Sequence, residues 1–542
     1  MKSILIVFLL LITTSIYSQE YAKNRLIVKY KPLTSSKKSS EINQILNQYN
    51  YSSTKSLTPS NQKEKSNVLN EILLITFKNE IDILKAINQL SNTGEFLYVE
   101  PDYIGSGSGK KIQSSSLVIN NSLLTTPDDT YFTRQWGFKN DGTFPLSNAT
   151  IGADVDMTLA WDVTTGNSDM IIAVLDSGIR FSHPEFSNRL WVNPSESNNN
   201  SDSDNNGYKD DLSGWDFANF DNDPTDDHGH GTNVTGILLA NGDNNNGYAG
   251  VNWKSKIMPL KILDKDNNGF YSWWIEAINY AVNNGAKVIN MSVGGSGYSN
   301  GMKDAVDFAY SKNVVITVSM HNENNDTPYY PSAYTNTIAV GSTDPDDKRS
   351  KPFFWSSSSG SNYGSHIDVV APGNYIYGLS YSSNIQYNTY WGGTSQAAPL
   401  VAGICSLILD QKPNLTVEQV RSILRDTAED QVGDPMEDIA GWDKFYGAGR
   451  VNANNALQKV LSTDTYSKDL NITLFPNPTN GRMKIDGSLY NYEFTIYDIL
   501  GKIVSKGKTF NNSINLPQLK KGIYTLKLKS TFGVTTKKII KN

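Results

Sequence analysis

The sequence is poor in cysteine, in histidine and in net positive charge. One cysteine among 542 residues excludes an intramolecular disulfide, and any histidine chemistry must use one of only five histidines. Charged residues make up 19% of the chain, below the roughly 25% of an average globular domain. The formal net charge of −6 argues against a nucleic-acid-binding chain, because such chains usually carry a basic face. We therefore expect no nucleic-acid partner.

Long apolar runs are also missing. The run near the start, Ile4 to Ile12, is far shorter than the roughly 20 residues that a membrane-spanning helix needs. It follows Lys2 and precedes a small residue, Ser18, an order typical of a secretory signal peptide. We predict such a peptide at 1–18, with cleavage after Ser18; a buried strand at a domain start is the alternative.

The remaining chain divides by pattern into three folded units. Mixed strand and helix patterns at 19–104 predict a small α+β module. A Gly/Ser- and Lys-rich stretch at 105–124 is typical of a flexible linker. Strand and helix patterns alternate over 125–461, which predicts an α/β domain whose parallel sheet carries helices on both faces. A polar linker at 462–471 precedes short strands at 472–542, predicted to form an all-β, sandwich-like unit.

Individual elements follow from the spacing of apolar residues. Alternating or continuous apolar runs of four to eight residues indicate strands, and apolar residues three or four apart indicate helices. Strands are expected at 72–77, 96–99, 170–176, 287–293 and 314–319, and helices at 83–90, 274–282, 302–309 and from the glycines at 392–393 to about 409.

Three short motifs carry residues suited to catalysis. Asp176 ends an apolar strand, where ligand sites of open α/β sheets gather, although a plain turn residue is common there. His230 begins a small-residue stretch that leads into a helix; a surface histidine is the alternative, and His228 is close by. Ser395, within the Gly392–Pro399 segment, opens the most apolar helix, and its alternative role is a helix cap. The positive end of that helix also favours a developing oxyanion.

Together, in the order Asp, His, Ser, these motifs resemble the subtilisin-like serine proteases. The resemblance covers about 125–461 and implies a subtilisin-like doubly wound parallel sheet. It implies an endopeptidase in which Ser395 attacks the peptide carbonyl, His230 transfers the proton and Asp176 orients His230. Position 397 is alanine, so the segment lacks the Gly-x-Ser-x-Gly elbow of lipases and esterases. The expected substrates are proteins or peptides.

The resemblance also assigns residues that bind the substrate. Ser292, Val293, Gly294 and Gly295 look like the strand that pairs with substrate backbone and lines the first specificity pocket. Asn322 aligns with the family's oxyanion asparagine. The family usually has Ala-Ala-Gly-Asn there, whereas this chain has Ser-Met-His-Asn, so His321 replaces a glycine and could reshape the loop.

An Asn/Asp-rich segment before His230 suggests calcium. Oxygen ligands without sulfur or imidazole favour calcium over zinc, and a chain without disulfides needs another way to hold its loops. A solvated acidic loop is the alternative. The first proposed ligand set recurs at every second position and resembles part of an EF-hand: Asp202, Asp204, Asn206, the backbone of Tyr208 and Asp210. The second set resembles a thermitase-like calcium loop: Asp221, Asp223, Thr225 and Asp227.

The flanking units resemble known companions of such proteases. Residues 19–104 look like an inhibitor-type propeptide, with Val99–Tyr103 matching its usual end, which implies self-processing somewhere in 104–126. The last 70 residues resemble the type A sorting domain of the Bacteroidetes type IX secretion system, through Phe475–Pro478 and Lys537–Lys541 among other pieces. These features imply a zymogen exported through the periplasm of a Gram-negative bacterium to the surface or medium, with that machinery as partner. A surface binding protein on an inactive protease scaffold is the alternative.

Overall fold

The computed structural model describes most of the chain as two compact units. The described residues are 19–32, 39–58, 71–113, 126–462, 473–486, 492–498, 501–509, 513–516, 518–530 and 533–542. One unit ends at Val460 and the other starts at Leu461. The signal peptide expected at 1–18 lies outside the described residues, as does most of both expected linkers. No helix within the described ranges is long and apolar enough to cross a membrane.

The first segment of the larger unit is a small α+β module, as predicted. Its four strands form an antiparallel sheet in the order β4-β1-β3-β2. Apolar side chains of α2, such as Ile83 and Leu90, pack in one core with Leu26 and Val28 of β1. The elements are β1 (Tyr21–Tyr30), α1 (Ser39–Gln48), β2 (Tyr51–Ser56), β3 (Ile72–Phe77), α2 (Ile83–Asn92) and β4 (Phe96–Gly107).

A seven-stranded sheet forms the centre of the larger unit. All neighbouring strands run parallel, in the order β14-β13-β12-β10-β6-β8-β7. Every residue of β10, β12, β13 and β14 is buried, as expected for parallel strands covered on both faces. The strands are β6 (Ile171–Asp176), β7 (Trp215–Asp216), β8 (Lys256–Lys261), β10 (Val288–Met291), β12 (Val315–Ser319), β13 (Ile338–Thr343) and β14 (Val369–Pro372).

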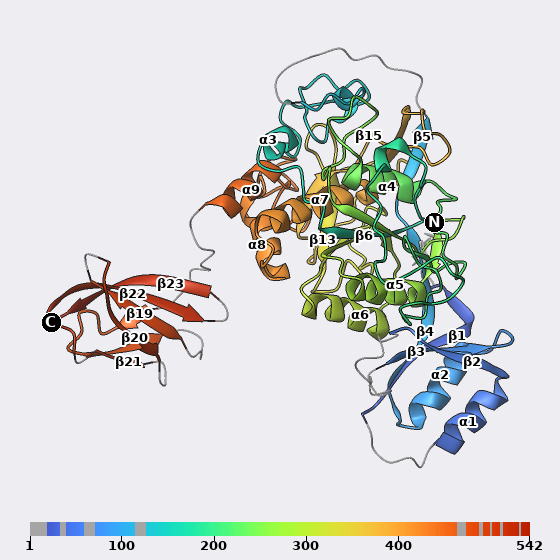
Figure 1. Cartoon of the computed structure of the whole chain (residues 1–542), viewed down its shortest axis with the longest axis horizontal. Coiled ribbons are helices and arrows are strands. Elements are labelled where there is room, and N and C mark those ends of the chain that lie inside the picture. The colour runs from blue at the N-terminus through green and yellow to red at the C-terminus, as the bar shows by residue number, and fades with distance from the viewer. Residues whose placement is uncertain are drawn as a thin grey trace, which may run out of the picture. The chain divides into compact units, whose positions relative to one another are not determined.

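Helices cover both faces of this sheet, which confirms the predicted fold class (Figure 1). Helix α7 packs against α4 and against β10, β12, β13 and β14, whereas α5 and α6 pack together and contact β6 and β12, respectively. Thr416 and Gln419 form a capping box that starts α8. The helices are α3 (Met157–Trp161), α4 (His230–Leu239), α5 (Tyr271–Asn283), α6 (Asn300–Ser311), α7 (Thr394–Gln411), α8 (Val417–Thr427) and α9 (Ala453–Leu461), with 3₁₀ turns at Phe132–Arg134 and Pro184–Phe186.

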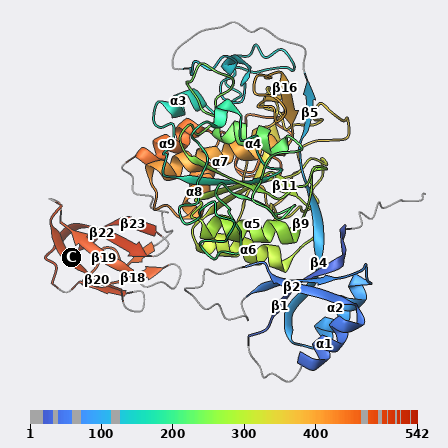
Figure 2. The ribbon, with the colours of Figure 1, turned by 45° about the vertical axis from the view of Figure 1, so that its right-hand side comes forward.

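Residues 105–113, expected as the start of a flexible linker, are strands instead. Strand β4 continues to Gly107 and pairs antiparallel with β11 (Val293–Gly294) and β9 (Asn268–Phe270). After two residues the chain forms β5 (Lys110–Gln113), which pairs with β16 (Thr389–Gly392), itself paired with β15 (Ile376–Tyr377). Figure 2 shows β4 leaving the small module and running past β9 and β11 toward β5. The expectation of a linker failed because the partner strands lie far away in sequence.

The smaller unit is all-β, as predicted. Two antiparallel sheets, β17-β18-β21 and β20-β19-β22-β23, share an apolar core. That core includes Met483 from the first sheet and Ile496, Leu526 and Ile539 from the second. The strands are β17 (Thr473–Phe475), β18 (Arg482–Asp486), β19 (Glu493–Tyr497), β20 (Ile503–Lys508), β21 (Ser513–Asn515), β22 (Gly522–Ser530) and β23 (Gly533–Lys541).

Candidate active site

Asp176 and His230 meet at the carboxyl end of the central sheet. Asp176 is the last residue of β6, and its Oδ1 accepts the backbone N–H of Ser177 at 2.7 Å. His230 is the first residue of α4, and its Nδ1 lies 2.7 Å from the same Asp176 Oδ1. Both side chains are buried, and the imidazole packs against the ring of Trp391 with centroids 5.5 Å apart. The carboxylate therefore fixes the orientation of the imidazole and leaves Nε2 facing away from it.

Ser395 is the second residue of α7, so its backbone N–H is one of the free donors at a helix start. Its Oγ donates to the carbonyl oxygen of Ser292 at 3.1 Å and lies 2.6 Å from the Oγ of Ser108. His230 Nε2 has no hydrogen-bond partner among the described residues. The hydroxyl of Ser395 therefore contacts Ser108 and Ser292, and it does not hydrogen-bond to the imidazole of His230.

The amide of Asn322 has a fixed direction. Its Oδ1 accepts the N–H of Thr394 at 2.9 Å and the hydroxyl of Thr394 at 3.1 Å, so its Nδ2 must face the other way. Nδ2 donates to the carbonyl oxygen of Ser108. The neighbouring residue, His321, has a positive φ of 76°. Glycine adopts this backbone conformation without strain, and histidine adopts it here as well. The loop thus keeps the asparagine directed at the bound carbonyl.

The side chain of His321 is held firmly beside this amide. Its ring stacks on Tyr329 with centroids 4.3 Å apart and planes inclined by 12°. Its Nδ1 lies 2.6 Å from Glu323 Oε2, which also accepts the N–H of Asn322 at 3.0 Å. Desolvation opposes the charge of Glu323, but the hydrogen bond and charge of His321 outweigh it and lower the pKa of that carboxyl.

Residues 105–113 lie along these groups as an extended chain. Val293 and Gly294 pair with Gly107 and Ser106, respectively, and the N–H of Ser108 donates to the carbonyl of Ser292 at 3.3 Å. Ser292, Val293 and Gly294, three of the four residues expected to bind substrate, thus contact the backbone of this segment. The fourth, Gly295, forms a bridge with Tyr330. The segment therefore pairs with the strand that was expected to bind substrate, and its Ser108 carbonyl accepts a hydrogen bond from Asn322.

Comparison with known proteins places this arrangement in a family. The profile of the subtilase family matches residues 167–449, more than half of the chain. The chain belongs to the subtilase family. The fervidolysin N-terminal prodomain matches residues 12–102, and the secretion system C-terminal sorting domain matches residues 473–542. This subtilase therefore has a prodomain at the position of the small α+β module and a sorting domain at the position of the all-β unit.

Individual relatives are also proteases. Thermitase from Thermoactinomyces vulgaris is 33% identical over 336 residues, which cover 61% of this chain and 99% of thermitase. A thermophilic serine proteinase from Bacillus sp. (strain AK1) is 30% identical over 410 residues, 73% of this chain and 84% of that protein. The crystal structure of fervidolysin from Fervidobacterium pennivorans has a TM-score of 0.60 at 20% identity, covers 96% of this chain and 76% of that one, and shares the fold. The protein is a subtilisin-like serine endopeptidase.

The acidic segment of this subtilase is arranged differently from its predicted pattern. Asp202 and Asp204 come together as expected, but their third partner is Glu196, and the three carboxylates each place an oxygen within 4.8 Å of the others. Burial, together with the charges of Asp202 and Glu196, raises the pKa of Asp204. Asp210, expected in the same set, instead accepts the N–H groups of residues 199 and 200 at 2.9 and 3.0 Å.

The other predicted ligands are engaged within the protein. Asn206 Oδ1 accepts the N–H of Tyr208 at 2.7 Å, and the hydroxyl of Tyr208 donates to Glu276 at 3.0 Å. Asp227 forms an ion pair with the buried Lys261 at 2.5 Å. Asp221 accepts the N–H of Asp223 at 3.0 Å. Within the described ranges, no second trio of such carboxylates is close enough to share one ion.

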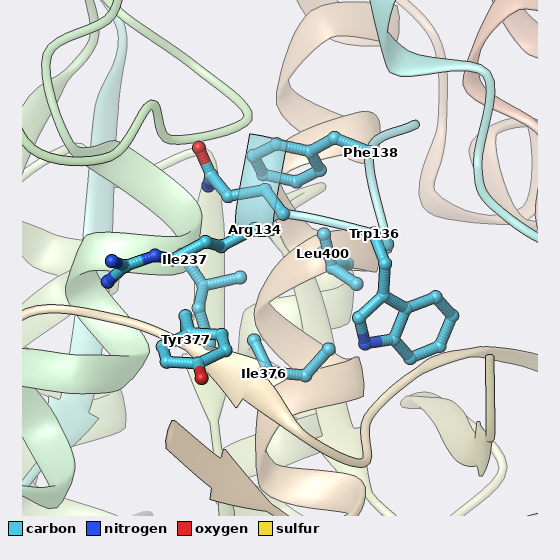
Figure 3. A pocket seen from close by; sticks show the side chains of 9 residues that line it. Arg134, Trp136, Phe138, Ile237, Ile376, Tyr377 and Leu400 are labelled. Atoms are coloured by element: carbon cyan, nitrogen blue, oxygen red, sulfur yellow. The ribbon is translucent and has the colours of Figure 1, made fainter. Parts of the chain in front are cut away.

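A small pocket of the subtilase domain lies apart from the candidate site. Figure 3 shows Ile237 of α4 and Leu400 of α7 lining it, beyond the helix starts that carry His230 and Ser395. Its other lining residues are Arg134, Gln135, Trp136, Gly137, Phe138, Ile376 and Tyr377. None of these lining residues is one of the candidate catalytic residues Asp176, His230, Ser395 and Asn322.

Three functional contacts were missed by sequence reasoning. Thr394 orients the Asn322 amide, and its place directly before Ser395 was the available signal. The Oγ of Ser319 lies 3.0 Å from the Oγ of Ser108. Ser319 belongs to the Ser-Met-His-Asn stretch, which differs from the usual family sequence. Glu196 stands outside the regular alternation of acidic residues, so no spacing pointed to it.

Proposed function

We propose that this endopeptidase cleaves peptide bonds by acyl transfer to Ser395. The observation that carries the proposal is the placement of the Ser108 carbonyl, which accepts a hydrogen bond from Asn322 Nδ2 while the Ser395 hydroxyl lies at the same residue. The Ser395 N–H at the start of α7 supplies a second donor for the oxyanion. Asp176, hydrogen-bonded to His230 Nδ1, keeps the proton-accepting Nε2 available for the serine.

The reaction has an acylation half and a hydrolysis half. Ser395 Oγ forms a bond to the carbonyl carbon and gives its proton to His230 Nε2, and the charge on the carbonyl oxygen is held by Asn322 Nδ2 and the Ser395 N–H. The C–N bond then breaks, and His230 gives the proton to the departing amine. Water, deprotonated by His230, hydrolyses the acyl-enzyme and restores the serine.

The first substrate in this proposal is the chain itself, at the bond between Ser108 and Gly109. Gly109 Cα lies beside His230 Nε2, because a Cβ built on Gly109 would fall 3.1 Å from that nitrogen. Antiparallel pairing on both sides of the bond, β4 with β11 and β5 with β16, supports a productive, extended conformation. The zymogen is then processed at this bond, within the range expected from the sequence.

Two prodomain carboxylates support an inhibitory role for the prodomain after cleavage. Glu100 accepts the N–H groups of Asn300 and Gly301, both at 2.9 Å, at the start of α6. Asp102 accepts the N–H of Ser272 at 2.9 Å and its hydroxyl at 2.7 Å, at the start of α5. Negative charge is favourable at helix starts, so these contacts hold the prodomain across the cleft as an intramolecular inhibitor.

The test is the Ser395→Ala variant, with the N-terminus of the purified protein and casein hydrolysis as readouts. The wild-type protein should begin at Gly109 and digest casein. The variant should fold, keep its prodomain attached and lose casein hydrolysis by several orders of magnitude.

Normal processing and hydrolysis by Ser395→Ala would refute the serine assignment. Loss of hydrolysis with an N-terminus at a different residue would keep the mechanism and refute the bond. The replacement of glycine by His321 favours the alternative of an inactive binding scaffold, but the direction of the Asn322 amide favours the active enzyme.

We also propose a structural calcium ion at Glu196, Asp202 and Asp204. Three carboxylates whose oxygens converge, without sulfur or imidazole, suit a hard cation that prefers oxygen ligands. Two of these residues belong to the predicted first set, and the rest of both sets is not used in this proposal. A bound cation would relieve the repulsion that raises the pKa of Asp204.

The sorting domain supports export by the type IX machinery of a Gram-negative bacterium, to the cell surface or medium. The stretch from Lys502 to Asn542 has ten lysines and no acidic residue, so it is basic whereas the whole chain has a net negative charge. Deleting residues 470–542 in a native-type host should trap active protease in the periplasm. Equal release into the medium with and without these residues would contradict the proposal.

A further inference from the structure

The residue before the bound Ser108–Gly109 bond faces a narrow slot. The N–H of Ser108 donates to Ser292, and its side chain lies 3.0 Å, Oγ to Oγ, from Ser319. Segment 292–295 therefore forms one wall of the slot, and segment 319–322, which ends in the oxyanion asparagine, forms the other. A larger side chain at position 108 would have to extend between these two walls.

The imidazole of His321 lies against the wall that segment 292–295 forms. A Cβ built on Gly294 would fall 2.8 Å from His321 Cδ2 and 3.5 Å from Tyr329 Cδ1, so both rings rest against Gly294. The stack on Tyr329 and the hydrogen bond to Glu323 prevent the imidazole from swinging aside freely. The His321 side chain is only 10% exposed, so surrounding protein covers it.

The preceding positions are closed as well. A Cβ on Gly105 would fall 2.3 Å from Trp274 Cη2, and that indole is fully buried and donates from Nε1 to the carbonyl of Ile262 at 3.2 Å. A Cβ on Gly107 would fall 2.5 Å from Asn267 Oδ1, although this side chain has more freedom to move. The cleft therefore fits backbone at positions where many proteases accept large side chains.

We infer that this enzyme is selective for extended segments rich in glycine and other small residues, with His321 as the residue that restricts the position before the cleaved bond. This inference rests on the proposed function and names its substrate class. Glycine is required four residues before the bond, because Trp274 cannot yield. Glycine, alanine or serine is required directly before the bond, because a longer side chain would collide with the fixed imidazole.

The test uses internally quenched peptides built on residues 104–111, Ile-Gly-Ser-Gly-Ser-Gly-Lys-Lys, and the self-processed enzyme. One series replaces the residue equivalent to Ser108 by Ala, Leu or Phe, and another replaces that equivalent to Gly105 by Leu. The wild-type kcat/KM should be at least about 50 times higher for Ser than for Phe, within the range that steric discrimination reaches. His321→Gly should reduce this ratio to below about 5.

Two controls make the ratio specific. Asn245→Gly also replaces a residue of positive φ, 57°, on an exposed turn away from the cleft, and it should keep the wild-type ratio. His321→Gly should still reject Leu at the Gly105 position, because Trp274 is unchanged. Tyr329→Ala, which removes the ring behind the imidazole, should give an intermediate ratio and serves if His321→Gly does not fold.

The outcomes separate the two levels of the proposal. Equal cleavage of the Ser and Phe peptides by the wild-type enzyme, abolished by Ser395→Ala, would refute the selectivity and keep the proposed function. A ratio that is unchanged in both His321→Gly and Tyr329→Ala would refute the role of His321. Failure of the wild-type enzyme to cleave any peptide of the series, or casein, would refute the proposed function and the selectivity with it.

Discussion

The proposed catalytic centre and the acidic segment at 196–227 hold their polar side chains in opposite ways. At the proposed centre, Asp176, His230 and Ser395 each stand at the end of a regular element, and all three are buried. In the acidic segment the side chains stand mainly on the loops before and after β7, and they accept hydrogen bonds largely from nearby residues, as Asp210 does from Asn199. The central sheet and its helices position the first set of side chains. Hydrogen bonds to nearby residues position the acidic side chains.

Sequence patterns predict convergence at the ends of sheet strands better than convergence within loops. Because the ends of parallel strands and the starts of their crossover helices meet at one edge of the sheet, motif order alone determines which residues converge. In a loop, a carboxylate has many local donors to choose from, and an alternating pattern satisfies local turns as well as it would a metal ion. A loop carboxylate can also form an ion pair with a residue distant in sequence, as Asp227 does with Lys261 of β8.

The largest loss of activity is expected from removing the proposed oxyanion donor. Asn322→Ala removes the Nδ2 donor, and kcat should fall by about 10²–10³ because the Ser395 N–H alone remains. Kinetics on casein-derived peptides would measure it. Asn325→Ala, a nearby asparagine whose Oδ1 accepts the N–H of Thr327 at 3.0 Å, is the matched control and should stay near the wild-type rate. A loss below tenfold in Asn322→Ala would mean that the amide is not directed at the reacting carbonyl.

The smaller effect concerns the acidic segment. If the trio binds calcium, chelation should lower the melting temperature by several degrees, since a ligand at 100 times its dissociation constant stabilises by about 2.7 kcal/mol. Asp202→Asn should remove this dependence on calcium, whereas Asp223→Asn, outside the trio, should retain it. Thermal unfolding of Ser395→Ala protein avoids self-digestion during the measurement. A calcium response that is lost in Asp223→Asn and kept in Asp202→Asn would assign the ion to the second set instead.

Much of the fold was predictable because the spacing of apolar residues follows their burial. The strand expected at 170–176 is β6, and the helix expected at 274–282 lies within α5. The strand expected at 287–293 is interrupted at Ser292, whose carbonyl turns to the bound segment, and local sequence carries no sign of that partner. Glu196 escaped prediction for the same reason, because only the folded loop brings it to Asp202.

The continuous path from β4 to β5 through the cleft has a kinetic consequence. A cleavable bond that is tethered to its own enzyme reaches the site by a first-order process, so its rate does not depend on how dilute the zymogen is. If the Ser108–Gly109 bond is cut as proposed, β4 and β5 belong to different molecules, and the return of the prodomain becomes a bimolecular event. Dilution upon export would then slow the rebinding of the cleaved prodomain, so the inhibited protease would become active as its concentration falls.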